Sequence, residues 1–393
     1  MDLVIFNSLL YVGTLLVYWF RRRKIDAGFI LLAVYAAIAI ACVFNYASDP
    51  DIWELQLWPF LYLYVVCMLF FRPYFFDSNI LYERLYVRSE STLNVFTIVF
   101  ITCSIISVYY SVSLAIENIN SGSWSELRNK LYAGEIELYS NQLERFSNIF
   151  VQYLSPLAII LLFYYLTLKL RKPIFLIILS ISSIAPTFII SINTASRGIL
   201  VNLSVSIFMG YVIFRKGIPQ RINKAIYIYG LSLLSIFLIY SLAVTSSRFS
   251  GSESSSSLLS YFGQSMLVFN YGLSDSIYIY ADGKFFFNWF LPFLEISPFN
   301  YYTNGTHFGT SFFTFVGAWY LDFGPVGTFI IAICLPIVIS HSFRNKNRVD
   351  LADLFIFFFY FNYLIQGVFV IGRGNALAWV MAFIIYGILK IIK

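Results

Sequence analysis

The sequence predicts an all-α polytopic membrane protein that crosses the bilayer about eleven times, and two observations predict it. Apolar residues make up 59% of the 393 residues and charged residues only 12%, about half of the roughly 25% typical of soluble domains. The charges also gather in segments between long apolar runs. A surface with so few charges must face lipid, which excludes a soluble enzyme, a secreted domain and a nucleic-acid-binding protein.

Eleven apolar segments approach the roughly 20 residues that a spanning helix needs. Because charged groups are costly in lipid, the charged segments between them are expected to be loops. The whole chain, residues 1–393, is therefore expected to form a single transmembrane domain, with twelve spans as the alternative count. The predicted spans are 3–20, 26–46, 54–71, 93–115, 148–169, 174–193, 198–214, 225–246, 325–341, 353–371 and 375–390.

The distribution of basic residues predicts the orientation. The first apolar run is followed by Arg21, Arg22, Arg23 and Lys24, whereas a cleavable signal peptide has its basic residues before the apolar run. With the N-terminus outside, 19 of the 26 basic residues fall in inside loops, and the net charges become +13 inside and −7 outside. This asymmetry follows the positive-inside rule, so the C-terminus is expected inside.

Two predicted outer loops are long. Residues 116–147 are expected to form a helical hairpin outside the membrane. Residues 247–324 begin with a serine-rich stretch and continue into aromatic segments at 261–281 and 285–299 that are too interrupted to span. Because Tyr and Trp favour the membrane–water boundary, we expect a large outer loop of short interfacial helices.

Pro325 follows an apolar segment, 311–321, at the end of this loop. Proline is favoured in the first turn of a helix. We therefore expect a spanning helix to begin at Pro325 after a segment that lies flat on the membrane. One long broken helix over 311–340 is the alternative.

The sequence predicts no metal centre, disulfide framework or cofactor. The four cysteines lie singly in apolar runs, as small buried hydrophobic residues do. His307 and His341 fall on opposite sides of the membrane, which excludes a site that needs both. The Asp49-Pro50-Asp51 segment is interpreted as a turn, although two carboxylates at this spacing could also hold a divalent metal.

Three arginines on the outer side are the strongest candidates for a binding site: Arg197, Arg248 and Arg373. Arg197 and Arg373 lie between spans that leave almost no loop, and Gly198, Gly372 and Gly374 flank them. Arginine forms a fixed fork that suits a phosphate and does not deprotonate. The three residues are predicted to bind a lipid-linked pyrophosphate at headgroup depth, with snorkelling to lipid phosphates as the alternative.

Candidates for the remaining chemistry follow in the same outer loop. Asp322, Glu295 and His307 are candidate catalytic groups that could take a proton from a sugar hydroxyl. The alternatives are a helix cap for Asp322 and a hydrogen-bonding surface residue for His307. Exposed aromatic residues could stack on sugar rings or anchor the loop at the interface; they are Trp289, Tyr301 and Tyr302.

These motifs resemble a known family. They are the Ser196-Arg197-Gly198 start of a span, the long outer loop, Gly309-Thr310-Ser311, the segment from Tyr320 to Gly327, and Arg373-Gly374. Together, over about residues 190–375, they resemble O-antigen and capsule repeat-unit polymerases of the Wzy type. The chain is also distantly similar to O-antigen ligases, although His307 lies further from the Gly324–Gly327 helix start than in that pattern.

The resemblance implies a bacterial inner-membrane glycosyltransferase of GT-C-like architecture with its active site facing the periplasm or the cell exterior. Its substrates would be oligosaccharide repeat units on undecaprenyl pyrophosphate, and the growing chain would move en bloc onto a new unit. A chain-length regulator protein would be a possible partner, besides the lipid bilayer, and no cofactor would be required. The hypothesis is therefore a polysaccharide polymerase, with an O-antigen ligase or a repeat-unit flippase as alternatives.

Overall fold

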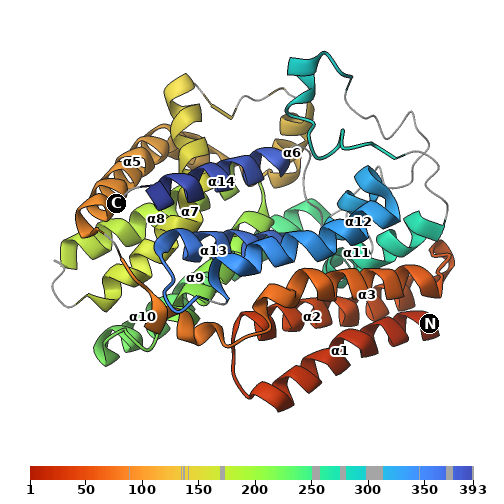
Figure 1. Ribbon diagram of the computed structural model, residues 1–393. Helices are drawn as coiled ribbons and strands as arrows, with labels where there is room; N and C mark the ends of the chain where they lie inside the picture. Colours follow the sequence, from red (N-terminus) through yellow and green to blue (C-terminus); the bar gives the residue numbers. More distant parts are fainter. Residues whose placement is uncertain are drawn as a thin grey trace. The chain divides into compact units, whose positions relative to one another are not determined.

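The protein is all-helical, which confirms the predicted class (Figure 1). No strand forms in the part of the chain that the structure describes, where one isolated bridge joins Leu85 and Val349. The computed structural model describes residues 1–87, 89–133, 135, 138–139, 141–168, 173–249, 257–274, 280–297, 313–344, 346–368 and 375–391.

Seven helical stretches of the described residues are long and apolar enough to cross a membrane, as in a multi-pass membrane protein. Each of the eleven predicted spans overlaps a helix, while the number of crossings stays a prediction. The seven stretches are α1 (Asp2–Arg22), α2 (Ala27–Ser48), the stretch Leu57–Arg84 that begins with α3 (Leu57–Phe71) and ends with α4 (Leu81–Arg84), α5 (Glu90–Ser121), α7 (Gln142–Thr167), α8 (Pro173–Asn193) and α12 (Thr314–Phe343).

The other helices are shorter, less apolar or only partly described at side-chain level. They are α6 (Trp124–Ala133), α9 (Arg197–Phe214), α10 (Gln220–Phe249), α11 (Ser257–Ser274), α13 (Leu351–Gln366) and α14 (Asn375–Ile391).

The chain divides into two compact units, and the single transmembrane domain expected from the sequence stays a prediction. Unit 1 comprises Met1–Ser78, Ser254–Asn347 and Phe359–Ile385, and it contains α1, α2, α3, α11 and α12. Unit 2 comprises Asn79–Glu253, Arg348–Phe358 and Tyr386–Lys393, and it contains α4 to α10. Helices α13 and α14 contribute residues to both units.

In unit 1, α2 packs against both α1 and α11, and α1, α2 and α3 lie side by side (Figure 1). The contact with α11 is close because Gly263 has no side chain: a Cβ there would lie 2.3 Å from the carbonyl oxygen of Ala41. The Cys42 thiol donates a hydrogen bond to the Gly263 carbonyl over 2.8 Å. Helix α11, which falls in the predicted interfacial loop, is thus packed into unit 1 with Met266 and Leu267 buried.

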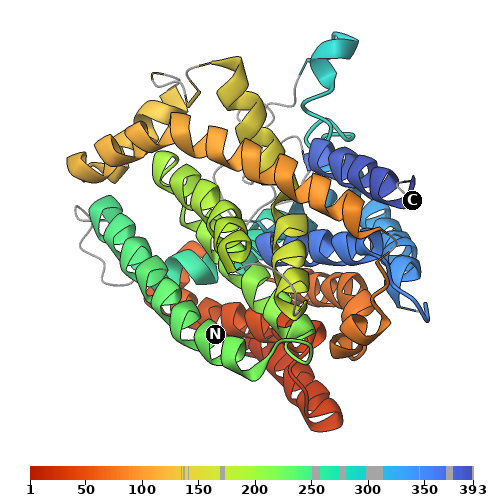
Figure 2. The same cartoon turned by 90° about the vertical axis from the view of Figure 1, so that its left-hand side faces the viewer.

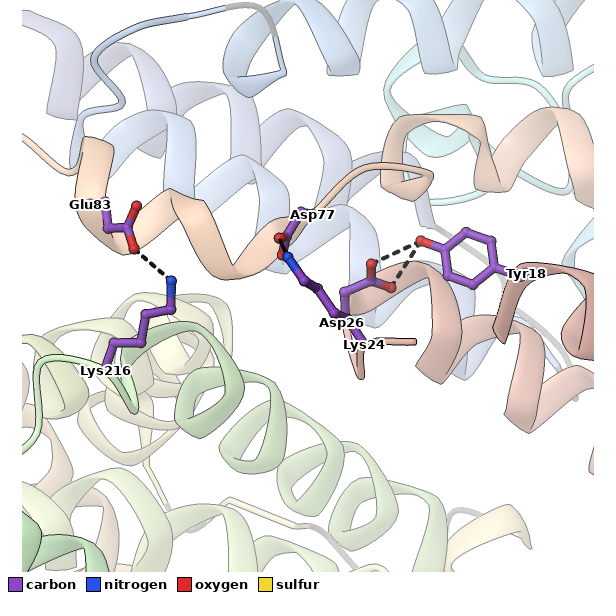
Figure 3. A network of polar contacts seen from close by, with 6 residues as sticks. All are labelled: Tyr18, Lys24, Asp26, Asp77, Glu83 and Lys216. Carbon is purple, nitrogen blue, oxygen red and sulfur yellow. Dashed lines mark hydrogen bonds and ion pairs between the residues drawn. The ribbon is translucent and has the colours of Figure 1, made fainter. Parts of the chain in front are cut away.

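The start of α2 is fixed by polar contacts around Asp26 (Figure 3). Asp26 is the N-cap residue, and its carboxylate accepts a hydrogen bond from the Phe29 amide. The Tyr18 hydroxyl lies 2.9 Å from both carboxylate oxygens, and Lys24 pairs with Asp77 over 2.6 Å. These contacts join the end of α1 to the start of α2 and to the segment after α3.

Unit 2 is built around α5, a 32-residue helix that packs against both α7 and α8 (Figure 2). The side chain of Asn141 caps α7 by accepting the Glu144 amide over 2.8 Å. The predicted outer hairpin 116–147 therefore contains the last turns of α5, all of α6 and the first turns of α7. An ion pair of 2.6 Å between Lys216 and Glu83 joins the residues after α9 to α4 (Figure 3).

Helix α12 is interrupted at Gly324, which has φ 66° and ψ −177°. Glycine adopts this positive φ without a steric penalty, and Pro325 then begins the second helical segment, as predicted. The Tyr62 hydroxyl donates to the Pro325 carbonyl oxygen over 2.7 Å. The residues before the break are also helical, so the alternative interpretation, one broken helix, describes this region.

A first prediction concerns the α2–α11 contact. We expect Gly263→Ala to lower stability by about 1–3 kcal/mol, as overpacked cores do, because the new methyl group would overlap the main chain at Ala41. The matched control is Gly230→Ala in α10, where nothing lies within 4 Å of the added Cβ; it should be neutral or stabilising. Thermal unfolding of the detergent-purified protein checks this, and equal melting temperatures for the two variants would contradict the contact.

A second prediction concerns Asp26. Burial raises the pKa of its carboxyl group above the ordinary value, despite the hydrogen bonds from Phe29 and Tyr18. The wild-type protein should therefore lose stability relative to Asp26→Asn as the pH rises through this raised pKa, since the asparagine stays neutral. Asparagine keeps the N-cap, whereas Asp26→Ala should cost about 1 kcal/mol by removing it. Melting temperatures from pH 4 to pH 8 that differ by a constant amount would refute this.

Candidate functional site

Of the nine predicted site residues, two belong to unit 2, three belong to unit 1 and four lie outside the described residues. Arg197 is the first residue of α9, and Arg248 is the next-to-last residue of α10, both in unit 2. Asp322, Glu295 and Trp289 belong to unit 1. The remaining four lie outside the described residues; they are Arg373, His307, Tyr301 and Tyr302.

The turn between α8 and α9 is held by side chains from three helices of unit 2. Within α8, the Ser191 hydroxyl donates to the Ser196 carbonyl oxygen over 2.6 Å. From α10, the Tyr240 hydroxyl donates to the Ser191 carbonyl oxygen over 3.0 Å. From α6, the guanidinium of Arg128 donates to the Ala195 carbonyl oxygen over 3.3 Å. Ala195 has a left-handed φ of 48°, so these contacts stabilise a strained turn directly before Arg197.

The end of α10 lies at the same place. Val244 of α10 is buried in one apolar cluster with Ala195 of the turn and with Trp124 and Leu127 of α6. Arg248 follows Val244 by about one helical turn. The structure therefore brings together the helix ends that carry two of the three predicted arginines. We call this region the arginine corner: Arg128, the turn 194–196, the first turn of α9 and the last turn of α10.

The arginine corner contains a helix N-terminus to which an anion could bind. Ser196, the N-cap residue of α9, makes no side-chain hydrogen bond to the helix, so its side chain leaves the first-turn amides of α9 available. The N-terminus of a helix carries a partial positive charge and favours phosphate groups. At the second position, Gly198 is exposed, and nothing lies within 4 Å of where a Cβ would be. An anion could approach the main chain closely there.

A buried polar network lies beside the arginine corner, between α5, α7 and α8. The Ser111 hydroxyl donates to a carboxylate oxygen of Glu144 over 3.0 Å, and the Asn193 side-chain amide donates to the Ser111 carbonyl oxygen over 3.0 Å. Asn148 donates to the Ser111 hydroxyl oxygen over 3.3 Å, and Asn118 donates to the Asn193 side-chain oxygen over 3.4 Å. All five residues are at most 7% exposed.

The sequence interpretation missed Glu144, because it placed this residue in the outer hairpin. Two signals could have found it. Asn141 and Glu144 have the spacing of an N-cap and a third helical residue, which predicts a helix start at this point. Ser104, Ser111 and Asn118 recur every seven residues along α5, which places a polar stripe on one face of a largely apolar helix.

In unit 1, Asp322 holds a neighbouring segment in place. Its side chain is buried, and its two carboxylate oxygens accept hydrogen bonds from the amides of Phe285 (3.0 Å) and Phe286 (2.7 Å). The Ala281 amide donates to the Leu321 carbonyl oxygen over 2.8 Å. The predicted helix cap at Pro325 is thus corrected: Asp322 accepts amides of the segment 281–294, not those of the helix that follows it.

This segment also contacts the start of α14. The Ala376 amide donates to the Phe286 carbonyl oxygen over 3.3 Å, and Ala376 follows Arg373 by three residues in the sequence. Asp322 and the first turn of α14 are therefore joined through two adjacent residues, Phe285 and Phe286. That Asp322 also acts as a base stays a prediction.

Glu295 and Trp289 lie on the same segment. Glu295 is exposed, has a φ of 56° and ends the short 3-10 helix Leu291–Leu294. Trp289 is half-buried, and its ring lies beside those of Phe290 and Phe293. Several neighbouring apolar residues are exposed, as in a segment that faces lipid or a ligand; they are Phe287, Phe290, Phe293, Leu294 and Ile296.

Replacing Asp322 tests whether its main role is to hold the segment. We expect Asp322→Ala to destabilise the protein by about 1–3 kcal/mol, because two buried amides lose their acceptor. Asp322→Asn keeps one acceptor oxygen and should cost less. Trypsin cleavage at Lys284, followed by mass spectrometry, should become faster in the order wild type, Asn, Ala. Cleavage at one rate in all three proteins would show that the carboxylate does not hold the segment.

Within the described residues, no group of three His, Cys, Asp or Glu side chains is arranged to hold a metal ion. Asp49 and Asp51, the paired carboxylates of the sequence, are both exposed. Comparisons with protein-family models, with curated proteins and with solved structures give no match to this chain.

Proposed function

We propose that this protein is a polysaccharide polymerase of the bacterial inner membrane. It would transfer a glycan chain from undecaprenyl pyrophosphate en bloc onto a new lipid-linked repeat unit at the periplasmic face. The observation that carries this proposal is the arginine corner. There the N-terminus of α9, which bears Arg197 and has no side-chain cap, lies close to the end of α10 that bears Arg248. A pyrophosphate attached to a membrane lipid is an anion that suits such a site.

The proposed reaction breaks the bond between the anomeric carbon and the pyrophosphate oxygen. A hydroxyl group of the acceptor repeat unit attacks the anomeric carbon, and undecaprenyl pyrophosphate leaves with the electron pair. Positive groups fixed near the leaving oxygen stabilise the charge that develops in the transition state, which is the role of Arg197, Arg248 and Arg373. The hydroxyl proton passes to a base, for which Asp322, Glu295 and His307 remain the predicted candidates.

The placement of charged residues supports an enzyme over a transporter. A transporter usually keeps charged groups in the middle of its spans, facing a central pathway. In the described helices, Asp, Glu, Lys and Arg lie within the first or last two turns, apart from Asp322 beside the break in α12. Charges at the helix ends lie near the membrane surfaces and not along a central pathway.

A polymerisation assay in cells tests this function through Arg197. We expect Arg197→Ala to abolish the ladder of polymer lengths and Arg197→Lys to lower the polymer yield by more than about tenfold, because lysine keeps the charge but loses the two-pronged fork. The matched control is Arg215→Ala, which removes an exposed arginine at the other end of the same helix and should leave the ladder unchanged.

The host for this assay is a strain that lacks the gene, complemented with each variant at equal protein levels. The empty strain should leave single repeat units on the final lipid, whereas loss of a ligase would leave none. Normal ladders from both Arg197 variants would contradict the assignment of Arg197. A strain without any attached repeat unit would favour the ligase alternative instead.

A further inference from the structure

We propose that Glu144 is a positioning residue for the arginine corner. Its carboxylate holds Ser111, Ser111 holds Asn193, and Asn193 begins the turn that leads to Arg197. This inference rests on the proposed function, because it assumes that Arg197 binds a pyrophosphate. It adds a residue that the sequence motifs did not indicate and assigns it a role that acts through another group.

The first link is the contact between α7 and α5. Glu144 is 3% exposed, and its carboxylate accepts the Ser111 hydroxyl over 3.0 Å. Asn148, one turn further along α7, donates to the Ser111 hydroxyl oxygen and accepts the Ser107 hydroxyl over 2.8 Å. The Ser107, Asn148 and Ser111 donors thus follow one another toward the carboxylate, which fixes the rotamer of each residue.

The second link is the contact between α5 and α8. The main-chain carbonyl of Ser111 accepts the Asn193 side-chain amide over 3.0 Å, and Asn118 donates to the other end of the same amide group. Asn193 is the last residue of α8, and the left-handed Ala195 follows two residues later. The Ser111 carbonyl therefore holds the last residue of α8 in place, at the start of the turn that leads into α9.

A carboxylate at this place needs a reason, because a buried charge is costly in a membrane protein. Part of the cost is offset by the helix, since Glu144 lies in the first turn of α7, where the helix dipole favours a negative group. What the turn requires of Glu144 is an acceptor oxygen at a fixed point.

General helix packing is the competing explanation for the network, and the same helix pair provides a control for it. At the other end of the α5–α7 contact, the Thr97 hydroxyl lies 3.2 Å from the Tyr165 hydroxyl. Thr97 lies 14 residues before Ser111, about 21 Å along the helix. Thr97→Val removes a buried hydroxyl group from the α5–α7 contact at a distance from the turn, so it reports the effect of packing alone.

The experiment measures the affinity of the detergent-purified full-length protein for inorganic pyrophosphate by titration calorimetry, together with the melting temperature. We expect Glu144→Ala and Ser111→Ala each to weaken pyrophosphate binding about tenfold, the effect of one lost hydrogen bond on the position of Arg197. Glu144→Gln should bind within about threefold of wild type, because it keeps an acceptor oxygen. Thr97→Val should bind like wild type.

Arg197 supplies the test that a purely structural role would fail. If Glu144 acts through Arg197, adding Glu144→Ala to Arg197→Ala should not weaken pyrophosphate binding further, so the two effects are not additive. Additive losses, a glutamine variant as weak as the alanine variant, or wild-type affinity in both Glu144→Ala and Ser111→Ala would overturn the proposal. Wild-type affinity in Arg197→Ala alone would instead reject the proposed function.

Discussion

The structure depends on one constraint: a bilayer core offers no water to main-chain amides and carbonyls. Helices satisfy these groups internally, so polar side chains are required mainly where a helix ends or breaks. Arg128 and Tyr240 donate hydrogen bonds to main-chain carbonyls around the α8–α9 turn, and Tyr62 donates to the Pro325 carbonyl at the break in α12. The Asp322 carboxylate accepts hydrogen bonds from two amides of a segment outside the helices. Several polar residues of this apolar chain thus lie at its irregular points.

The same points are where a ligand can reach the main chain. The α8–α9 turn leaves the first amides of α9 without a side-chain cap, and the residues that hold the turn come from several helices of unit 2. A turn fixed in this way holds the main chain at the start of α9 without a ligand, which lowers the cost of ordering that main chain on binding. In unit 1, the carboxylate of Asp322 holds a segment that contains several exposed aromatic residues.

Local patterns in the sequence predicted the all-helical class and the apolar helices of the fold. The low charge content indicated an all-α membrane protein, and Gly324 followed by Pro325 indicated a helix start. The partners of the buried carboxylates were not predictable, because Ser111 and Glu144 are 33 residues apart and Phe285 and Asp322 are 37 apart. The two arginines were recognised by position alone. The helix ends that carry them come together through the apolar cluster that contains both Val244 and Ala195, which neither local sequence predicts.

The most direct test of the central claim is an in vitro assay with the purified protein in proteoliposomes. A single synthetic repeat unit on undecaprenyl pyrophosphate is the substrate, and the products are separated by length. The account predicts a ladder of longer lipid-linked glycans, with one undecaprenyl pyrophosphate released for each linkage formed. Intact repeat units that move across the proteoliposome membrane without any elongation would contradict it.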